Sequence, residues 1–274
     1  MEQTYITCSI YLRAWGLSMA QHVRRLLLMR HPQESMLTLF KRQVKGFAYL
    51  LFHPYYLRRM IIREIVYGRR YESKQGWVEW QIFDSYTSAP QHGSEVSLAR
   101  PLNIARIKII SGMVKNVGSN LKVLDVGCGD GAIGEAIRKM GNTVVSLELP
   151  KVAVLAKKHY KVPLIVAGDA EHLPFRKEAF DAVLSSELME HLWDPHSFVE
   201  ETYKVLRDNG HLIVATPEGP ESLRYDAHKH YFTVETLKKM LCDKFVLCEF
   251  KRLGPICAPT STIILLFRKV LAVN

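Results

Sequence analysis

The stretch Val123-Leu124-Asp125-Val126-Gly127-Cys128-Gly129-Asp130-Gly131 decides the fold. Its mainly apolar first half predicts a buried strand, its alternate glycines predict a tight turn, and helical sequence begins near Ala132. Gly127 and Gly129 permit a positive φ and let a ligand approach the backbone, because no Cβ stands in the way. The start of the following helix presents unpaired N–H groups above this turn. The sequence therefore predicts a ligand site where the first strand of a sheet ends.

Short apolar runs alternate with helical stretches from Leu121 onward. Because nearly continuous apolar strands separated by helices are typical of parallel sheets covered on both faces, the pattern predicts a doubly wound α/β domain. The expected strands are Lys122–Val126, Thr143–Glu148, Leu164–Ala167, Asp181–Ser185, His211–Ala215, Phe245–Phe250 and Ser261–Phe267. The expected helices are Ala132–Met140, Val152–His159 and Ser197–Leu206, with Asn103–Lys115 leading into the first strand. The last two strands are predicted to form an antiparallel, hairpin-like end to a mostly parallel seven-stranded sheet.

The positive charge is concentrated at the N-terminus. The 274 residues allow one large domain, with or without an appendage, and residues 1–70 carry +9 of the net charge of +10. A neutral body with a basic arm predicts an anionic partner, either phospholipid head groups or nucleic acid. Within the arm, Leu17–Arg30 and Tyr55–Arg70 place apolar residues at helical spacing with arginines beside them. We expect a basic helical extension over residues 1–100, which either packs on the domain of residues 101–274 or contacts a membrane surface.

Cysteine usage and hydropathy bear on the compartment. The five cysteines are odd in number and include no C-x-x-C pair, so neither a disulfide framework nor a zinc site is indicated. No apolar run reaches the roughly 18 residues that span a bilayer. We expect a cytoplasmic protein, peripheral at a membrane face if the arm binds lipid. The arginines of residues 1–30 leave an organelle transit peptide as an alternative.

Acidic residues at three strand ends point to the ligand. Glu148 lies 21 residues after Gly127, at a distance typical of an acid that binds ribose hydroxyls. Asp125 would repel a pyrophosphate but attract an amine and a sulfonium. Asp169 and Ala170 follow the third strand, where an acid and a small residue can contact adenine. Together they favour S-adenosylmethionine over a nicotinamide dinucleotide.

At these residues the chain resembles the class I S-adenosylmethionine-dependent methyltransferases, in particular the ubiquinone-biosynthesis O-methyltransferases and similar small-molecule enzymes. The matching segments are VLDVGCGDGAIG (123–134), Glu148, GDAEHLPF (168–175), FDAVLSSELMEHLWDP (180–195) and LRDNGHLIVATP (206–217). The resemblance implies a Rossmann-like methyltransferase fold with seven strands, the last of them antiparallel. It also implies a set of cofactor-binding residues: Asp125, Gly127 and Gly129 beneath the methionine part, Glu148 at the ribose, Asp169 and Ala170 at the adenine, and Ser186 beside the cofactor, with Cys128 and Leu149 as further cofactor-binding candidates.

The sequence after the fourth strand concerns the methyl acceptor. It has no Asn/Asp-Pro-Pro-Tyr/Phe element of the kind that holds exocyclic base nitrogens, which argues against N-methylation of adenine or cytosine in DNA. Glu187, Glu190 and His191 could instead converge on one helical turn. They resemble the E-x-x-E-H stretch of ubiquinone-biosynthesis O-methyltransferases and of small-RNA terminal 2′-O-methyltransferases, in which a divalent metal such as Mg²⁺ can be held. The alternatives for His191 are a general base or a structural cap.

A second group of histidines follows the fifth strand. The segment His228-Lys229-His230-Tyr231-Phe232-Thr233 resembles an element that small-molecule methyltransferases place over the substrate. We expect His230 to face the substrate and His191 to be the main base. Thr233, with Glu235 and Thr236, also predicts the N-cap of a helix over Val234–Leu241.

Three functional hypotheses result. The favoured one is methyl transfer from S-adenosylmethionine to an oxygen of a small-molecule, lipid or glycan acceptor, at or near a membrane face. The alternative is an RNA ribose 2′-O-methyltransferase that places its N-terminal arginines on phosphates. Nucleic acid is the weaker reading because the body is neutral and the arm's aromatic residues lie in apolar runs. A non-catalytic adaptor is disfavoured because it has no physical need for Asp125 and Glu148.

Overall fold

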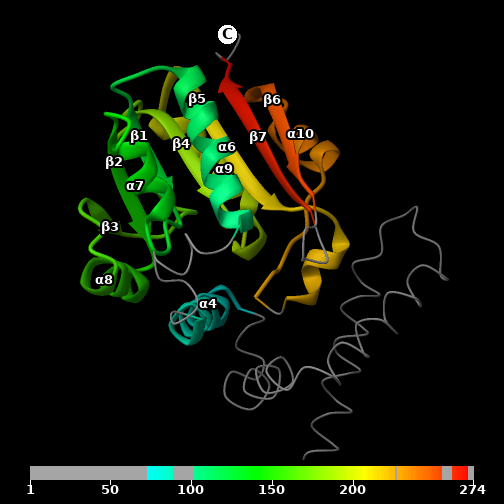
Figure 1. The fold of residues 1–274 in the computed structure, drawn as a ribbon. Helices are drawn as coiled ribbons and strands as arrows, with labels where there is room; N and C mark the ends of the chain where they lie inside the picture. The colour runs from blue at the N-terminus through cyan, green and yellow to red at the C-terminus, as the bar shows by residue number, and fades with distance from the viewer. Residues whose placement is uncertain (1–72, 89–100, 226, 255–260, 271–274) are drawn as a thin grey trace, which may run out of the picture. The chain divides into compact units, whose positions relative to one another are not determined.

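The computed structural model describes residues 73–88, 101–225, 227–254 and 261–270 (Figure 1). The helices expected at 17–30 and 55–70, and all of the basic residues 1–70, lie outside these ranges. Internal contacts divide the chain into Met1–Trp80 and Gln81–Asn274, and the boundary expected after residue 100 stays a prediction. Helix α4 (Lys74–Ser88) crosses this division. Among the described helices, none is both long and apolar enough to cross a membrane.

A seven-stranded sheet with the order β3-β2-β1-β4-β5-β7-β6 forms the centre of the domain (Figure 1). Neighbours pair in parallel from β3 through β5, whereas β7 pairs antiparallel with both β5 and β6. The predicted doubly wound, mostly parallel sheet with a reversed last strand is therefore confirmed. The strands are β1 (Lys122–Val126), β2 (Thr143–Glu148), β3 (Ile165–Ala167), β4 (Phe180–Ser186), β5 (Leu206–Pro217), β6 (Phe245–Leu253) and β7 (Thr262–Lys269).

Helices cover both faces of this sheet, and each face has its own apolar core. On one face, α6 (Pro101–Val117) and α7 (Ala132–Arg138) pack on one set of strand residues, which includes Val123. On the other face, α9 (Pro195–Val205) and α10 (Val234–Leu241) pack on the alternate set, which includes Leu124 and Val126. Because side chains alternate along a strand, the buried run of β1 supplies both cores. Helix α8 (Pro150–His159) lies beside β2 and β3.

Several element bounds differ from the sequence prediction, and for two of them the structure shows the cause. Helix α9 begins at Pro195 rather than Ser197, because the Asp194 carboxylate caps it by accepting from the backbone N–H of His196 at 3.0 Å. Strand β5 begins at Leu206, five residues earlier than expected. Leu206 pairs with Phe180, and the register then shifts before the regular ladder resumes, so a segment that reads as a turn is incorporated as a bulge.

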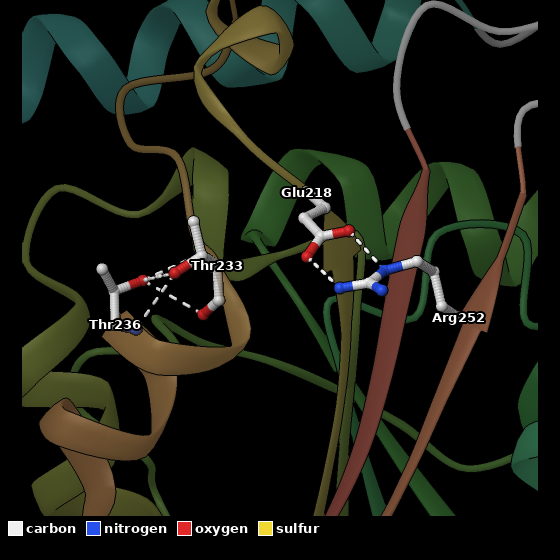
Figure 2. Close-up of polar contacts among 4 residues, drawn as sticks. All are labelled: Glu218, Thr233, Thr236 and Arg252. Atoms are coloured by element: carbon white, nitrogen blue, oxygen red, sulfur yellow. Dashed lines mark hydrogen bonds and ion pairs between the residues drawn. The ribbon is translucent and has the colours of Figure 1, made fainter. Parts of the chain in front are cut away.

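Side-chain contacts fix the loop that leads from β5 to α10 (Figure 2). The Thr233 hydroxyl accepts from the backbone N–H of Thr236 at 3.2 Å, and the Thr236 hydroxyl accepts from the backbone N–H of Thr233 at 2.8 Å. This capping box confirms the predicted N-cap, with Thr236 as the partner. Glu218, which directly follows β5, accepts two hydrogen bonds of 2.6 Å from the guanidinium of Arg252 in β6. The loop therefore begins and ends at fixed points beside the carboxyl end of β5.

Candidate cofactor and acceptor site

The turn after β1 has the conformation that its glycines predict. Gly127 and Gly129 have φ values of 69° and 53°. A Cβ on Gly127 would lie 2.8 Å from the Leu188 side chain, so the segment after β4 approaches this turn too closely for any larger residue. A Cβ on Gly129 would meet no atom within 4 Å. The backbone at Gly129 is therefore open to a ligand.

Asp125 lies beneath the turn and is 2% exposed. Its Oδ2 makes no hydrogen bond with the described residues. Burial, together with the charges of Glu148 and Asp130, raises the pKa of Asp125 to about 7, and the backbone N–H of Gly134 opposes this shift. A carboxyl group held near its pKa at neutral pH is sensitive to any positive charge placed above it.

Glu148 joins the end of β2 to the same turn. Its Oε2 accepts from the backbone N–H of Gly129 at 3.1 Å, and its Oε1 accepts from that of Leu149 at 2.9 Å. Burial raises the pKa of Glu148, while these two hydrogen bonds lower it. The pKa of the Cys128 thiol is raised well above its usual value, first by burial and then by the charge of Asp125. The Cys128 side chain is therefore an uncharged thiol and not a thiolate nucleophile.

The segment after β3 places the expected adenine contacts. The Asp169 Oδ1 accepts from the backbone N–H of Glu171 at 2.9 Å, and Ala170 is 7% exposed. Glu171, which sequence reasoning did not single out, is 5% exposed. Its Oε1 accepts from the backbone N–H groups of Trp193 at 2.7 Å and Asp194 at 3.1 Å. Glu171 thereby joins the predicted adenine segment to the segment that follows β4.

The segment after β4 differs from the expected helical turn. Ser186 ends the strand, and its Oγ is buried without a hydrogen bond among the described residues. Glu187 has a left-handed φ of 54°, and the 3-10 helix η4 begins only at Met189 (Met189–His191). The prediction of a single helical turn from Glu187 to His191 is therefore wrong. The Glu187 Oε1 instead lies 2.9 Å from Nη1 of Arg106 in α6.

Glu190, His191 and His228 converge, and each offers one ligand atom within 4.8 Å of the others. Glu190 is fully buried: its Oε2 accepts from the Thr216 hydroxyl at 2.9 Å, and its Oε1 has no hydrogen-bond partner among the described residues. Burial, and then the charge of Glu187, raises the pKa of Glu190 well above its usual range. Burial, and then the charge of His191, holds the pKa of His228 well below its usual range, so His228 is neutral.

Backbone carbonyls determine the tautomers of the three histidines, because a carbonyl oxygen can only accept a hydrogen bond. Nδ1 of His191 donates to Ala227 at 2.8 Å, and Nδ1 of His228 donates to Ser222 at 2.8 Å. The basic nitrogen of His191 is therefore Nε2, which lies 4.0 Å from the Glu190 Oε1. Nε2 of His230 lies 3.4 Å from the Trp193 carbonyl oxygen. His230 lies outside the group formed by Glu190, His191 and His228.

The structure thus brings the sequence-predicted residues into two groups. The cofactor candidates Asp125, Gly127, Cys128, Gly129, Glu148 and Leu149 surround one turn, and Glu190 and His191 form the second group with His228. Their functional roles stay predictions. Sequence reasoning missed His228 and Arg106. His228 lies in a segment that the sequence had marked, but its choice over His230 depends on a loop conformation that no local pattern encodes.

Comparison with known proteins finds sequence similarity to methyltransferases. Residues 124–214 match the family model described as "Methyltransferase domain". The chain is similar to the ubiquinone biosynthesis O-methyltransferase of Xylella fastidiosa (strain M23), with 32% identity over 146 residues, which cover 50% of this chain and 58% of the relative. It is similar to the enzyme of that name from Pelagibacter ubique, with 33% identity over 101 residues, which cover 35% and 42%. The matches span about half the length of these curated relatives.

A solved structure agrees with the fold. The 1,6-didemethyltoxoflavin-N1-methyltransferase of Burkholderia thailandensis, with bound 1,6-didemethyltoxoflavin and S-adenosylhomocysteine, has a TM-score of 0.57 at 19% identity. The alignment covers 73% of this chain and 91% of that protein. At this identity the likeness concerns the fold alone.

Proposed function

We propose that the described domain is a class I S-adenosylmethionine-dependent methyltransferase domain, and that the chain transfers a methyl group from S-adenosylmethionine to an oxygen of a small-molecule acceptor. The observation that carries the proposal is the arrangement of Asp125 and Glu148 around the open backbone of Gly129. Buried carboxyl groups in this position favour a cationic amine and sulfonium and disfavour a pyrophosphate. Asp169 and Ala170 are the proposed adenine contacts, and Ser186 and Leu149 complete the pocket.

The chain's own task in such a reaction is to align the acceptor and remove its proton. When bound, S-adenosylmethionine supplies an electrophilic methyl group. His191 is the proposed base, because the Ala227 carbonyl holds the proton on Nδ1 and leaves Nε2 as the basic nitrogen. The Glu190 Oε1 lies 4.0 Å from this Nε2, and Glu190 would stabilise the imidazolium that forms only in its ionised form, which burial disfavours. His230 is the proposed substrate-facing residue.

A divalent metal, for which the sequence suggests Mg²⁺, is the alternative means of activating the acceptor hydroxyl, although two imidazoles suit a transition-metal ion better. The residues fit this role in part, since the buried Glu190 Oε1 makes no hydrogen bond with the described residues and lies 4.0 Å from Nε2 of His191, and His228 offers a further ligand atom nearby. Glu190, His191 and His228 would hold the ion, and Glu187 would join them only by leaving Arg106. A bound dication would lower the pKa of the acceptor hydroxyl.

The names of the relatives favour a small-molecule acceptor over RNA, because the curated ones act in ubiquinone biosynthesis. Lipids and glycans that carry a hydroxyl group remain within the proposed acceptor class. The RNA ribose alternative has as support the basic charge of residues 1–70 and the likeness of Glu187, Glu190 and His191 to the stretch of small-RNA terminal 2′-O-methyltransferases.

We further propose that residues 1–70 attach the chain to an anionic membrane surface, on the cytoplasmic side. Their net charge is +9, and each basic side chain near such a surface contributes on the order of 1 kcal/mol. The full chain should sediment with phosphatidylserine vesicles at low salt and be released at high salt. Changing Arg59, Arg63 and Arg70 together to Gln should weaken the attachment. Binding to RNA with indifference to these vesicles would contradict this proposal.

The enzymatic proposal is tested with S-adenosylmethionine labelled on its methyl group and a panel of phenolic and aliphatic alcohols. We expect label in an ether product and a loss of at least about a hundredfold in kcat for His191→Ala, the usual contribution of a general base. A chelator leaves the rate unchanged if His191 acts as the base and abolishes it if a metal is required. Full activity of His191→Ala would exclude both roles, and label only on nitrogen or carbon would contradict the oxygen acceptor.

A further inference from the structure

An arginine from outside the sequence-predicted site holds one of its glutamates. Arg106 lies in the first half of α6, the helix that begins at the end of the domain where β4 and β5 have their carboxyl ends (Figure 1). Its Nη1 lies 2.9 Å from the Glu187 Oε1, and its Nη2 donates to the Asn103 Oδ1 at 3.2 Å. The two charged side chains are 19% and 31% exposed. The pair is therefore shielded from water more than a typical surface ion pair.

The backbone of Glu187 is fixed independently of this pair. Its φ is 54°, an uncommon value for a residue with a Cβ, and its N–H donates to the Ala215 carbonyl at 2.7 Å. Only the side chain can therefore change direction without disturbing the sheet. At present Arg106 determines that direction.

Glu187 and Arg106 act on the same buried group with opposite charges. Glu190 is affected by both, because the charge of Glu187 disfavours its ionised form and the charge of Arg106 favours it. The Glu190 Oε1 lies 4.0 Å from Nε2 of His191 and makes no hydrogen bond with the described residues, and Glu190, His191 and His228 each offer a ligand atom within 4.8 Å of the others. Around this oxygen, the described residues thus include two imidazoles, a second carboxylate just outside the group, and an arginine that neutralises that carboxylate.

We propose that Arg106 is a positioning residue that suppresses divalent-cation binding at Glu190, His191 and His228 by holding Glu187 in an ion pair outside the ligand set. The proposal concerns the proposed acceptor site, but it does not depend on the cofactor. Two physical effects act in the same direction. The guanidinium repels an incoming dication, and it withholds a hard oxygen ligand that such a cation prefers. While this ion pair is intact, the positive charge beside Glu187 is supplied by Arg106 and not by a bound metal ion.

The test measures Mn²⁺ binding to the full chain, without cofactor or acceptor, from the electron paramagnetic resonance signal of free Mn²⁺. Arg106→Met removes the charge and keeps an apolar stem. We expect it to bind Mn²⁺ at least about tenfold more tightly than the wild type, given the strength of charge interactions over a few ångströms in a partly buried site. Adding Glu187→Gln to this variant should abolish the gain.

The matched control is Arg207→Ala, which removes an arginine from the Arg207–Asp181 ion pair of 2.6 Å at the beginning of β4. It changes the net charge equally and should leave Mn²⁺ affinity unchanged. Equal affinity of Arg106→Met and wild type, equal gains in both arginine variants, or a gain that survives Glu187→Gln would each overturn the proposal. If Arg106→Met loses its native circular dichroism, Arg106→Gln serves instead, with the same gain of about tenfold expected because it also removes the positive charge. Calorimetry with S-adenosylhomocysteine on the same samples tests the cofactor proposal separately.

Discussion

Replacing Gly129 by alanine separates ligand binding from folding. Gly129 has a φ of 53°, and an added Cβ would meet no protein atom within 4 Å. The protein should therefore lose only the backbone cost of a left-handed alanine, about 1–2 kcal/mol, without a steric clash. For a domain of this size, that loss lowers Tm by roughly 2–8 °C. The new methyl group projects into the space where the proposed cofactor approaches the backbone.

Gly141 provides the matched control, because its φ is 88° and its added Cβ also meets no atom within 4 Å. It precedes β2, at the opposite edge of the sheet from the proposed site. Differential scanning fluorimetry should give similar losses in Tm for Gly129→Ala and Gly141→Ala. Calorimetry should then show S-adenosylhomocysteine affinity at least about tenfold weaker for Gly129→Ala only, equivalent to about 1.4 kcal/mol. Unchanged affinity in Gly129→Ala would refute the placement of the cofactor.

Three further predictions concern buried polar groups. Because the pKa of Asp125 is about 7, cationic S-adenosylmethionine must displace the proton of this carboxyl group when it binds. Calorimetry should therefore show an affinity for S-adenosylmethionine that rises about tenfold from pH 6 to pH 8, and Asp125→Asn should remove this rise. The pKa of His228 is lowered in the folded chain, so below about pH 6.5 the unfolded chain binds more protons than the folded chain. The free energy of unfolding should therefore decrease as the pH is lowered. In urea unfolding, lowering the pH from 7.5 to 5.5 should reduce the free energy of unfolding of His228→Gln by about 1.4 kcal/mol less than that of the wild type. An equal reduction in both proteins would contradict the lowered pKa of His228. Glu171→Ala should cost about 1–3 kcal/mol in the same assay, because two backbone N–H groups lose their acceptor, whereas Glu171→Gln keeps one oxygen and should cost less.

The parts of the fold that sequence predicts are those set by local pattern. The strands Lys122–Val126 and Thr143–Glu148 have the predicted bounds, because each is a short apolar run ended by a glycine or a proline. The N-cap at Thr233 follows from side-chain chemistry within four residues. By contrast, the early start of β5 depends on the pairing of Leu206 with Phe180, a contact between strands that local sequence does not encode.

The candidate site divides in the same way. The turn at Gly127 and Gly129 and its acids were predictable, since parallel strands bring their carboxyl ends to one edge. The partner of Glu187 was not, because Arg106 lies in a helix 81 positions earlier in the chain and reaches the site only through packing of α6 on the sheet. A motif of acids and a histidine therefore predicts a ligand set correctly only when no distant cation competes for one of its members.

Calorimetric titration of the full chain tests the central claim most directly, with S-adenosylmethionine, S-adenosylhomocysteine and NAD as separate titrants. The arrangement of Asp125 and Glu148 about Gly129 predicts saturable binding at one site per chain for the first two ligands and none for NAD. Binding of NAD together with an absence of heat for both sulfur-containing ligands would contradict it.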